Sequence, residues 1–278
     1  MKIAILADPH IGSQNDVFLE NWKAVVKTVN GCEDVELAIV LGDLTLDGAN
    51  IEADLAFGAA QLKVINTPVL VLPGNHDIGD IARDSVQPAD DTRLAAWETH
   101  FGAWYWQCDA VEGWRLIGLN SQIIGSCLPA EEQQWSALEN MLKERGDRKA
   151  VLFLHMPLFL EDWNEDDRPA WALKTEGRLR LQRLIAEHAV FAVVSGHMHR
   201  TLHLRQKNEP VLIWTPASSF LARDESMPSQ PGKELLGVTL LDFGKDDISV
   251  EFIDIDGLMK SYIEDYNGSI YRSPAKTA

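Results

Sequence analysis

The chain has 278 residues, with 25 Lys and Arg against 42 Asp and Glu, so its formal net charge is −17. Affinity for nucleic acids depends on neutralising phosphates with basic side chains, and this balance therefore argues against a long nucleic acid as partner. Hydrophobic residues make up 46% and charged residues 24% of the chain, which excludes disorder as its main state.

The cysteines and the N-terminus bear on the compartment. Cys32, Cys108 and Cys127 are odd in number and widely spaced, so they provide neither a disulfide framework nor a paired-thiolate zinc site. The first apolar run stops at Asp8, too early for a signal peptide, and no later run is long enough to span a bilayer. We therefore expect a cytoplasmic protein without a membrane span, with bacterial export left open.

Short apolar runs alternate with amphipathic stretches along most of the chain. Strands are predicted at 2–7, 36–41, 68–72, 114–119, 150–154 and 190–194, and helices at 16–29, 52–65, 128–145 and 176–188. This alternation is typical of an α/β core with right-handed crossovers. Three further runs, at 211–214, 236–243 and 248–255, follow without a helix and predict a meander or a second sheet. We therefore expect a two-sheet α/β sandwich.

The chain shows neither an internal repeat nor a Gly/Ser linker, so we expect one domain over 1–265 and a polar tail over 266–278. The Asp- and Pro-rich insertion 79–91 and the acidic insertion 161–168 are interpreted as solvated loops rather than as lids over a substrate. Most of a group of aromatic residues are interpreted as core or interface: Trp97, Trp104, Tyr105, Trp106, Trp163 and Trp171.

Polar side chains stand just past the carboxyl ends of five of the predicted strands. They are Asp8 and His10 after the first run, Asp43 after the second, Asn75, His76 and Asp77 after the third, His155 after the fifth, and His197 and His199 after the sixth. In an open α/β sheet these strand ends line up along one rim, where ligands bind. We therefore expect side chains that are distant in sequence to converge there.

The chemistry of this set indicates metal. It contains five of the eight histidines together with aspartates and an asparagine, and buried imidazoles and carboxylates need a compensating cation. The ligands are too many for one tetrahedral centre but suit two ions that share a carboxylate. Oxygen and nitrogen donors without a thiolate suit Mn, Fe or Zn. Two metals held roughly 3.5–4 Å apart are typical of displacement at phosphorus.

The motifs D-x-H, G-D, G-N-H-D, H and G-H-x-H, in this order from Asp8 to His199, resemble the calcineurin-like metallophosphoesterase superfamily. The resemblance implies a four-layer α/β/β/α sandwich of two mixed β-sheets flanked by helices. It also implies a dinuclear hydrolase whose nucleophile is a bridging hydroxide. Members often form dimers or higher oligomers, and a homo-oligomer is a further expectation.

Residue roles are carried over by position. The resemblance implies that Asp8, His10 and His199 bind the first metal, that Asn75, His155 and His197 bind the second, and that Asp43 bridges them. It implies that His76 points to the substrate and stabilises or protonates the leaving oxygen, with Asp77 orienting its ring. His197 and His199, two residues apart after Gly196, would have their side chains on one face if extended.

The second motif, G-D at residues 42–43, indicates which branch of this superfamily the chain resembles. Protein Ser/Thr phosphatases of this superfamily extend it to G-D-x-V-D-R-G, whose arginine holds the phosphate, whereas residues 42–48 read GDLTLDG with Asp47 in the arginine's place. A carboxylate there favours phosphodiesters, which carry one charge fewer than monoesters. With the sequence WTPA at 214–217, this form resembles class III cyclic nucleotide phosphodiesterases and bacterial glycerophosphodiesterases.

The first functional hypothesis is accordingly hydrolysis of small phosphodiesters, namely 3′,5′-cyclic nucleotides or glycerophosphodiesters. A phosphomonoesterase or broad-specificity phosphatase on the same centre is the alternative. A nuclease is disfavoured by the acidic charge, and a non-catalytic metal-binding scaffold is disfavoured because no ligand position is lost.

Overall fold

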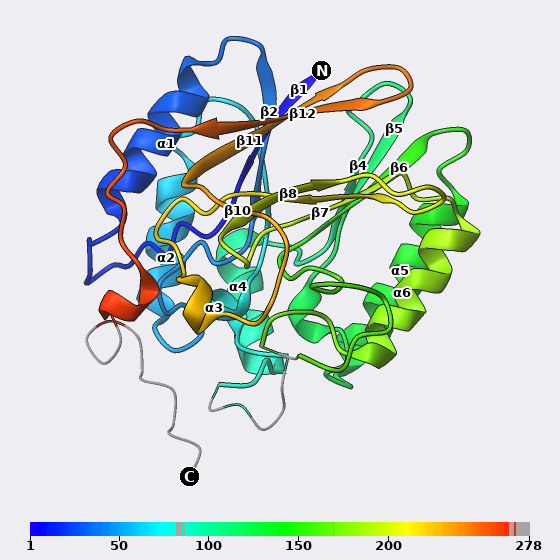
Figure 1. Cartoon of the computed structure of the whole chain (residues 1–278). Coiled ribbons are helices and arrows are strands. Elements are labelled where there is room, and N and C mark those ends of the chain that lie inside the picture. Colours follow the sequence, from blue (N-terminus) through cyan, green and yellow to red (C-terminus); the bar gives the residue numbers. More distant parts are fainter. Residues whose placement is uncertain (82–84, 86, 169, 267–269, 271–278) are drawn as a thin grey trace.

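The computed structural model describes residues 1–81, 85, 87–168, 170–266 and 270. Two β-sheets pack face to face, and helices cover the outer face of each (Figure 1). Helices α1 (Leu19–Gly31) and α2 (Glu52–Leu62) lie on the first sheet, and α5 (Pro129–Lys143) and α6 (Thr175–Glu187) lie on the second. The predicted α/β/β/α sandwich is confirmed.

The first sheet is mixed and has the strand order β12-β11-β1-β2-β3. Strands β1 (Lys2–Leu6), β2 (Val35–Leu41) and β3 (Val69–Leu72) run parallel, as the helical crossovers α1 and α2 require. Strands β11 (Gly237–Phe243) and β12 (Ile248–Asp254) extend the sheet as an antiparallel hairpin beside β1. The C-terminal part of the chain therefore returns to the first sheet.

The second sheet has the order β10-β8-β9-β7-β6-β5-β4. Its parallel centre is formed by β5 (Trp114–Gly118), β6 (Lys149–Leu154), β7 (Ala192–Ser195) and β9 (Val211–Trp214). Antiparallel strands close both edges: β4 (Trp106–Cys108) on one side, and β8 (Arg200–Leu204) and β10 (Lys233–Glu234) on the other. This sheet is thus also mixed.

The structure corrects the prediction for the last three apolar runs. Instead of forming one meander, 211–214 joins the centre of the second sheet, whereas 236–243 and 248–255 belong to the first. The physical reason is pairing: β9 is parallel to β7, and β11 is antiparallel to β1. β11 therefore lies beside the first strand of the chain, whereas β9 lies between β7 and β8, which come shortly before it.

Three apolar layers hold the sandwich together. Between the sheets, Ile5 and Ile39 of the first sheet pack with Phe153 and Val194 of the second. The outer face of the first sheet packs against α1, whose Trp22, Val25, Val26 and Val29 recur at helical spacing. The outer face of the second sheet packs against Trp135, Leu138 and Leu142 of α5 and Leu181 of α6. Residues at strand ends are thereby held on a rigid frame.

Short elements complete the described chain. They are α3 (Asn75–Ile78), α4 (Asp91–Phe101), η1 (Ser121–Ile123), η2 (Asp224–Ser226) and η3 (Ile263–Tyr266). The core interpretation is confirmed for Trp97 and Trp104, which are buried with Leu94 of α4. Of the predicted tail 266–278, only Tyr266 and Ile270 are described, and both pack near Phe18. Within the described ranges, none of the helices combines the length and apolar character needed to cross a bilayer.

Candidate metal centre

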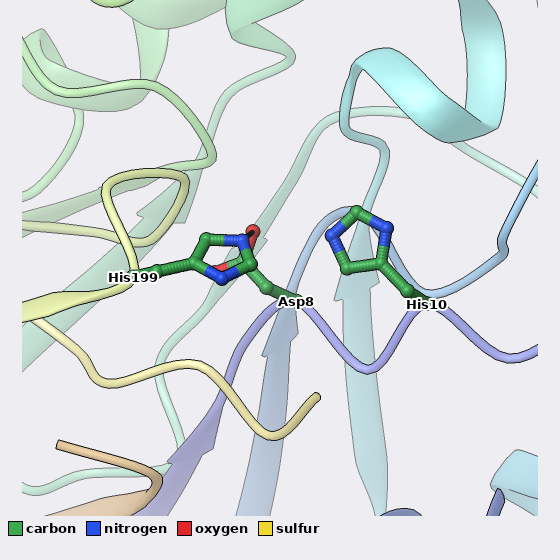
Figure 2. A group of neighbouring side chains, drawn as sticks. All are labelled: Asp8, His10 and His199. Atoms are coloured by element: carbon green, nitrogen blue, oxygen red, sulfur yellow. Dashed lines mark ion pairs between the residues drawn. The ribbon is translucent and has the colours of Figure 1, made fainter. Parts of the chain in front are cut away.

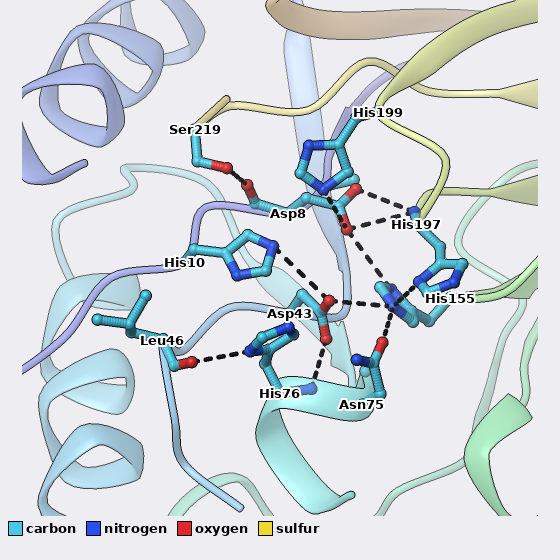
Figure 3. A network of polar contacts seen from close by, with 12 residues as sticks. Asp8, His10, Asp43, Leu46, Asn75, His76, His155, His197, His199 and Ser219 are labelled. Atoms are coloured by element: carbon cyan, nitrogen blue, oxygen red, sulfur yellow. Dashed lines mark hydrogen bonds and ion pairs between the residues drawn. The ribbon is translucent and has the colours of Figure 1, made fainter. Parts of the chain in front are cut away.

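The predicted site residues lie just past β1, β2, β3, β6 and β7, so both sheets contribute to one rim (Figure 3). Those after β3 belong to the short helix α3, and the others lie in loops. The first two loops run side by side. The Asp8 amide donates to Gly42 O at 3.2 Å, and the His10 amide donates to Asp43 O at 3.0 Å. These backbone bonds place Asp8, His10 and Asp43 next to one another before any ion is considered.

Five site residues have left-handed backbone conformations, with φ of 52° at Asp8, 48° at His10, 47° at Asp43, 67° at His197 and 51° at His199. Non-glycine residues in this region are strained, and such residues concentrate at functional sites. Because of these turns, the segment of His197 and His199 is not extended, so the condition under which the two side chains would share one face is not met. Their turn sends the two rings to different ligand groups.

Two glycines allow the loops to approach closely. A Cβ on Gly74 would lie 2.2 Å from Asp43 Oδ1, and a Cβ on Gly42 would lie 2.6 Å from His155 Nδ1. Gly42 also has φ of 81°. A side chain at either position would displace a site residue, which explains the glycines of the G-D and G-N-H-D motifs.

A first ligand group consists of Asp8, His10 and His199 (Figure 2). One potential ligand atom from each lies within 4.8 Å of the others, and His199 Nε2 is 3.7 Å from Asp8 Oδ1. All three side chains are buried. This is the set that the sequence motifs predicted for one ion.

A second ligand group consists of Asp43, His155 and His197, with the same 4.8 Å limit between ligand atoms. His155 Nε2 lies 3.0 Å from His197 Nδ1 and 3.2 Å from Asn75 Oδ1 (Figure 3). The structure therefore brings all members of the predicted second set together.

Asp43 lies between the two groups. Its Oδ2 is 3.6 Å from His10 Nε2 and 3.4 Å from His155 Nε2, while its Oδ1 accepts a hydrogen bond from the His76 amide at 2.8 Å. A third potential group combines Asp43 with His10 and His76. Asp43 Oδ2 thus lies near the Nε2 atoms of one histidine from each set, while Asp8 also approaches the second set, with its Oδ1 3.9 Å from His155 Nδ1.

Four of the histidines share one feature: one ring nitrogen faces a backbone carbonyl oxygen. The pairs are His155 Nδ1 with Leu41 at 2.8 Å, His199 Nδ1 with Phe220 at 2.6 Å, His197 Nε2 with Ala170 at 2.9 Å, and His76 Nδ1 with Leu46 at 2.8 Å. Because a carbonyl only accepts, each of these nitrogens carries the proton. When the rings of His155, His197 and His199 are neutral, the other nitrogen of each presents a lone pair, as metal ligation requires.

The predicted role of Asp77 needs correction. The Asp77 carboxylate accepts hydrogen bonds from the Gly74 amide at 2.9 Å and from the Thr45 amide and hydroxyl at 2.9 and 2.6 Å. The ring Nδ1 of His76 is instead oriented by Leu46 O. Asp77 is the third residue of the short helix α3, and its side chain turns back to the start of that helix, so it fixes the loops rather than the ring.

Burial and mutual charge shift the pKa values of the cluster. Burial raises the pKa of Asp8 to about 8, and it lowers the pKa of His197 to about 3 and of His199 to about 4. Burial also lowers the pKa of His155, but the carboxylates of Asp43 and Asp8 outweigh it and raise that pKa to about 9. Burial opposes ionisation of Asp43, yet His155 and the other imidazoles hold its pKa well below the usual range. Without metal, Asp8 and His155 therefore keep protons at neutral pH.

We expect the affinity of the metal-free protein for Mn²⁺ to rise with pH, most steeply up to about pH 9. Each bound ion must displace protons from groups whose pKa values are raised to about 8 and about 9, so the affinity should gain about tenfold per pH unit for each proton displaced. Isothermal titration calorimetry in buffers of different ionisation enthalpy measures both the Mn²⁺ affinity and the number of protons released. An affinity independent of pH, with no proton released, would contradict these protonation states.

The donor set fits divalent or trivalent metal. Imidazole and carboxyl groups that follow several strands face one another within 4.8 Å, and most of them are buried where uncompensated charges are costly. The set includes no thiolate, which suits Mn, Fe or Zn. Residues 8, 10, 43, 75, 155, 197 and 199 therefore form a site that can hold metal.

Sequence reasoning missed the segment that supports the first ligand group. Ser219 Oγ donates to Asp8 O at 2.6 Å, and the Phe220 ring packs 4.3 Å from His199 and 4.8 Å from His10. The WTPA sequence just before these residues was the only nearby signal. Neither the carbonyl of Phe220 nor the serine contact can be read from residue type.

The chain belongs to the family described as calcineurin-like phosphoesterase, which matches residues 1–201. Among curated relatives, the probable glycerophosphodiester phosphodiesterase GpdQ of Arcobacter nitrofigilis is 27% identical over 217 residues, which cover 72% of this chain and 72% of the relative. The serine/threonine-protein phosphatase CPPED1 of Bos taurus is 28% identical over 206 residues, covering 71% of this chain and 59% of the relative. The human CPPED1 is 28% identical over 163 residues, covering 56% of this chain and 49% of the relative.

The chain thus spans about half to three fifths of the length of these CPPED1 relatives. Solved structures agree on the fold. A purple acid phosphatase from yellow lupin superposes with a TM-score of 0.69 at 15% identity, covering 100% of this chain and 57% of its own. A dimetal phosphatase from Danio rerio superposes with a TM-score of 0.60 at 13% identity, covering 90% and 95% of the two chains.

Proposed function

We propose that this protein is a dinuclear metal-dependent phosphodiesterase that hydrolyses small phosphodiesters, such as 3′,5′-cyclic nucleotides or glycerophosphodiesters. The observation that carries the proposal is the position of Asp43 Oδ2, which lies within 3.6 Å of His10 Nε2 and 3.4 Å of His155 Nε2. One carboxylate thereby serves two groups of ligands. The GpdQ relative, matched over 72% of both chains, favours the diester class.

Residues of the two groups have distinct tasks. Asp8, His10 and His199 would hold one ion. Asn75, His155 and His197 would hold the other, and Asp43 would be shared by both. When bound, two such ions polarise phosphoryl oxygens and make a bound water acidic enough to act as nucleophile at neutral pH. We propose Mn, Fe or Zn for both positions, since these metals accept this donor set.

His76 is the proposed general acid. Its side chain is half-buried and its Nδ1 proton is committed to Leu46 O, so any proton delivered to a leaving oxygen is carried by Nε2. Its backbone amide is fixed on Asp43 Oδ1, which sets the position of the ring relative to the shared carboxylate. General acid catalysis of this kind contributes roughly 10²–10⁴ in rate.

The preference for diesters rests on charge. Asp47 occupies the position of the phosphate-holding arginine of protein phosphatases, and its carboxylate accepts from Asn50 Nδ2 at 2.6 Å. The Arg93 guanidinium, which reaches the same loop at Ala49 O, is paired with Asp90 at 2.6 Å. A monoester dianion would therefore meet an added negative charge at this loop, and a diester monoanion is repelled less.

We expect kcat/KM to be higher for bis(4-nitrophenyl) phosphate than for 4-nitrophenyl phosphate after reconstitution with Mn²⁺. Cyclic AMP and a glycerophosphodiester, assayed in parallel, then identify the natural class. Asp47→Arg should shift the ratio toward the monoester by about tenfold or more, because one favourable charge contact is worth about 1.4 kcal/mol or more at an effective dielectric constant near 20.

Asp47→Asn is the matched control for that experiment, since it removes the negative charge without adding a positive one and should shift the ratio less. Comparable or greater efficiency of the unmodified enzyme on the monoester would overturn the diester proposal. The alternative would then stand: a phosphomonoesterase on the same centre, in keeping with the name of the CPPED1 relatives. Absence of turnover with every metal would instead favour a binding scaffold.

A further inference from the structure

The acidic segment between β6 and α6 reaches the second ligand group. Ala170 O lies 2.9 Å from His197 Nε2, and the Nδ1 of the same ring lies 3.0 Å from His155 Nε2. The carbonyl can only accept, so the proton of the neutral ring stays on Nε2 and the lone pair of Nδ1 faces Asp43 and His155. The stretch that follows the acidic insertion 161–168 therefore contacts a candidate ligand.

Arg178 of α6 fixes this segment from inside the protein. Its side chain is fully buried and its guanidinium donates to Glu165 O at 2.5 Å, to Leu173 O at 3.3 Å and to Thr175 Oγ1 at 3.1 Å. The two carbonyls lie on either side of Ala170 in sequence. One guanidinium thereby contacts backbone carbonyls that precede and follow Ala170, whose own carbonyl oxygen meets His197.

Glu165 completes the anchor. Its side chain is 4% exposed, and its Oε1 lies 3.8 Å from Arg178 Nη1. The two carboxylate oxygens also accept from the Leu160 and Glu161 amides at 2.9 Å each. Removing one partner of a buried, hydrogen-bonded ion pair leaves the other charge uncompensated, so this contact resists opening.

We propose that Arg178 is a positioning residue for the second metal: through the segment that ends at Ala170 it holds His197 in the tautomer and orientation that ligate. This rests on the proposed dinuclear function, because it assigns His197 to an ion. Arg178 touches neither substrate nor metal in this scheme. Its effect passes through two backbone carbonyls and one hydrogen bond to an imidazole.

The test measures Mn²⁺ binding to the metal-free full chain by equilibrium dialysis, without substrate. Arg178→Met should weaken one of two equivalents about 10–100-fold, the usual cost of removing a ligand's hydrogen-bonded support, and leave the other unchanged. The equivalent lost should be the one lost in His197→Ala and not the one lost in His199→Ala. Arg178→Lys should recover only part of the lost Mn²⁺ affinity, since an ammonium lacks the fork geometry with which the guanidinium donates to both carbonyls.

Arg180→Met is the matched control, because Arg180 lies two residues along the same helix and pairs with the exposed Glu132 at 2.6 Å. It should bind both equivalents like the unmodified protein. Glu165→Gln provides a second variant should Arg178→Met fail to fold, with the same selective but smaller weakening expected. Equal loss of both equivalents, or no loss in folded variants, would overturn the proposal. Two intact equivalents without diester turnover would instead count against the proposed function alone.

Discussion

Replacing Asp43 with asparagine is expected to release metal from both ligand groups and to lower kcat/KM by about 1000-fold or more. The Asp43 carboxylate contacts ligands of both groups, and metal ions contribute several kcal/mol of transition-state stabilisation, with each 1.4 kcal/mol worth tenfold in rate. Asparagine keeps an oxygen that can accept from the His76 amide, so the fold should survive. Metal content by mass spectrometry and turnover of bis(4-nitrophenyl) phosphate measure the two effects.

Asp54→Asn is the control for Asp43→Asn. Asp54 is also buried, in the first turn of α2, where it accepts from the Ser13 amide at 2.7 Å and from the Asp47 amide at 3.2 Å. Its replacement should lower the melting temperature without changing the metal content. If Asp43→Asn retained two metal ions per chain, the shared position of this carboxylate would be refuted.

His76→Ala is expected to keep both metal ions and to lose about 10²–10⁴ in kcat on diesters with poor leaving groups. With 4-nitrophenolate as leaving group the loss should be much smaller, because that oxygen departs without needing a proton. Plotting log kcat against the pKa of the leaving alcohol gives the result directly: the slope should be steeper in the variant than in the unmodified enzyme.

His100→Ala provides the comparison for His76→Ala. His100 belongs to α4, and its Nε2 lies 3.3 Å from Glu52 Oε1, away from the two ligand groups. Its removal should change neither metal content nor the leaving-group slope. Equal losses on good and poor leaving groups in His76→Ala would show that the ring positions substrate rather than supplying a proton.

The convergence of the candidate site residues was predictable, because residue type and position at strand ends agreed. Asp8, Asp43 and His155 each follow a buried parallel strand, and the structure brings them together from two sheets. The support of the ligands was not predictable. Backbone carbonyls such as those of Ala170 and Phe220 have the same chemistry in every residue, so no sequence signal marks which of them meets an imidazole.

The helix and strand boundaries were also predictable only in part. The first helix begins at Leu19 instead of 16, because Asn15 Oδ1 accepts from the Val17 amide and the Leu19 amide bonds Asp16 O, which forms a turn before the helix. Helix α4 was missed although its signal was present: Asp90 caps it by accepting from the Arg93 amide at 2.8 Å. The placement of β11 beside β1 was not readable, because strand order depends on long-range pairing.

The assignment of Asp77 illustrates the limit of transferring roles by motif. Its place next to His76 in the sequence suggested a contact with the ring, but a residue at the third position of a helix directs its carboxylate to the amides at the helix start. The helix geometry thus decides the role of Asp77, and the carbonyl of Leu46 takes over the orientation of His76.

The central claim is that two ions share Asp43 at the rim formed by both sheets. Anomalous difference maps from crystals equilibrated with Mn²⁺ test it most directly. The account predicts two peaks roughly 3.5–4 Å apart, one beside Asp8, His10 and His199 and the other beside Asn75, His155 and His197, with Asp43 between them. A single peak, or two peaks that do not share Asp43, would contradict it.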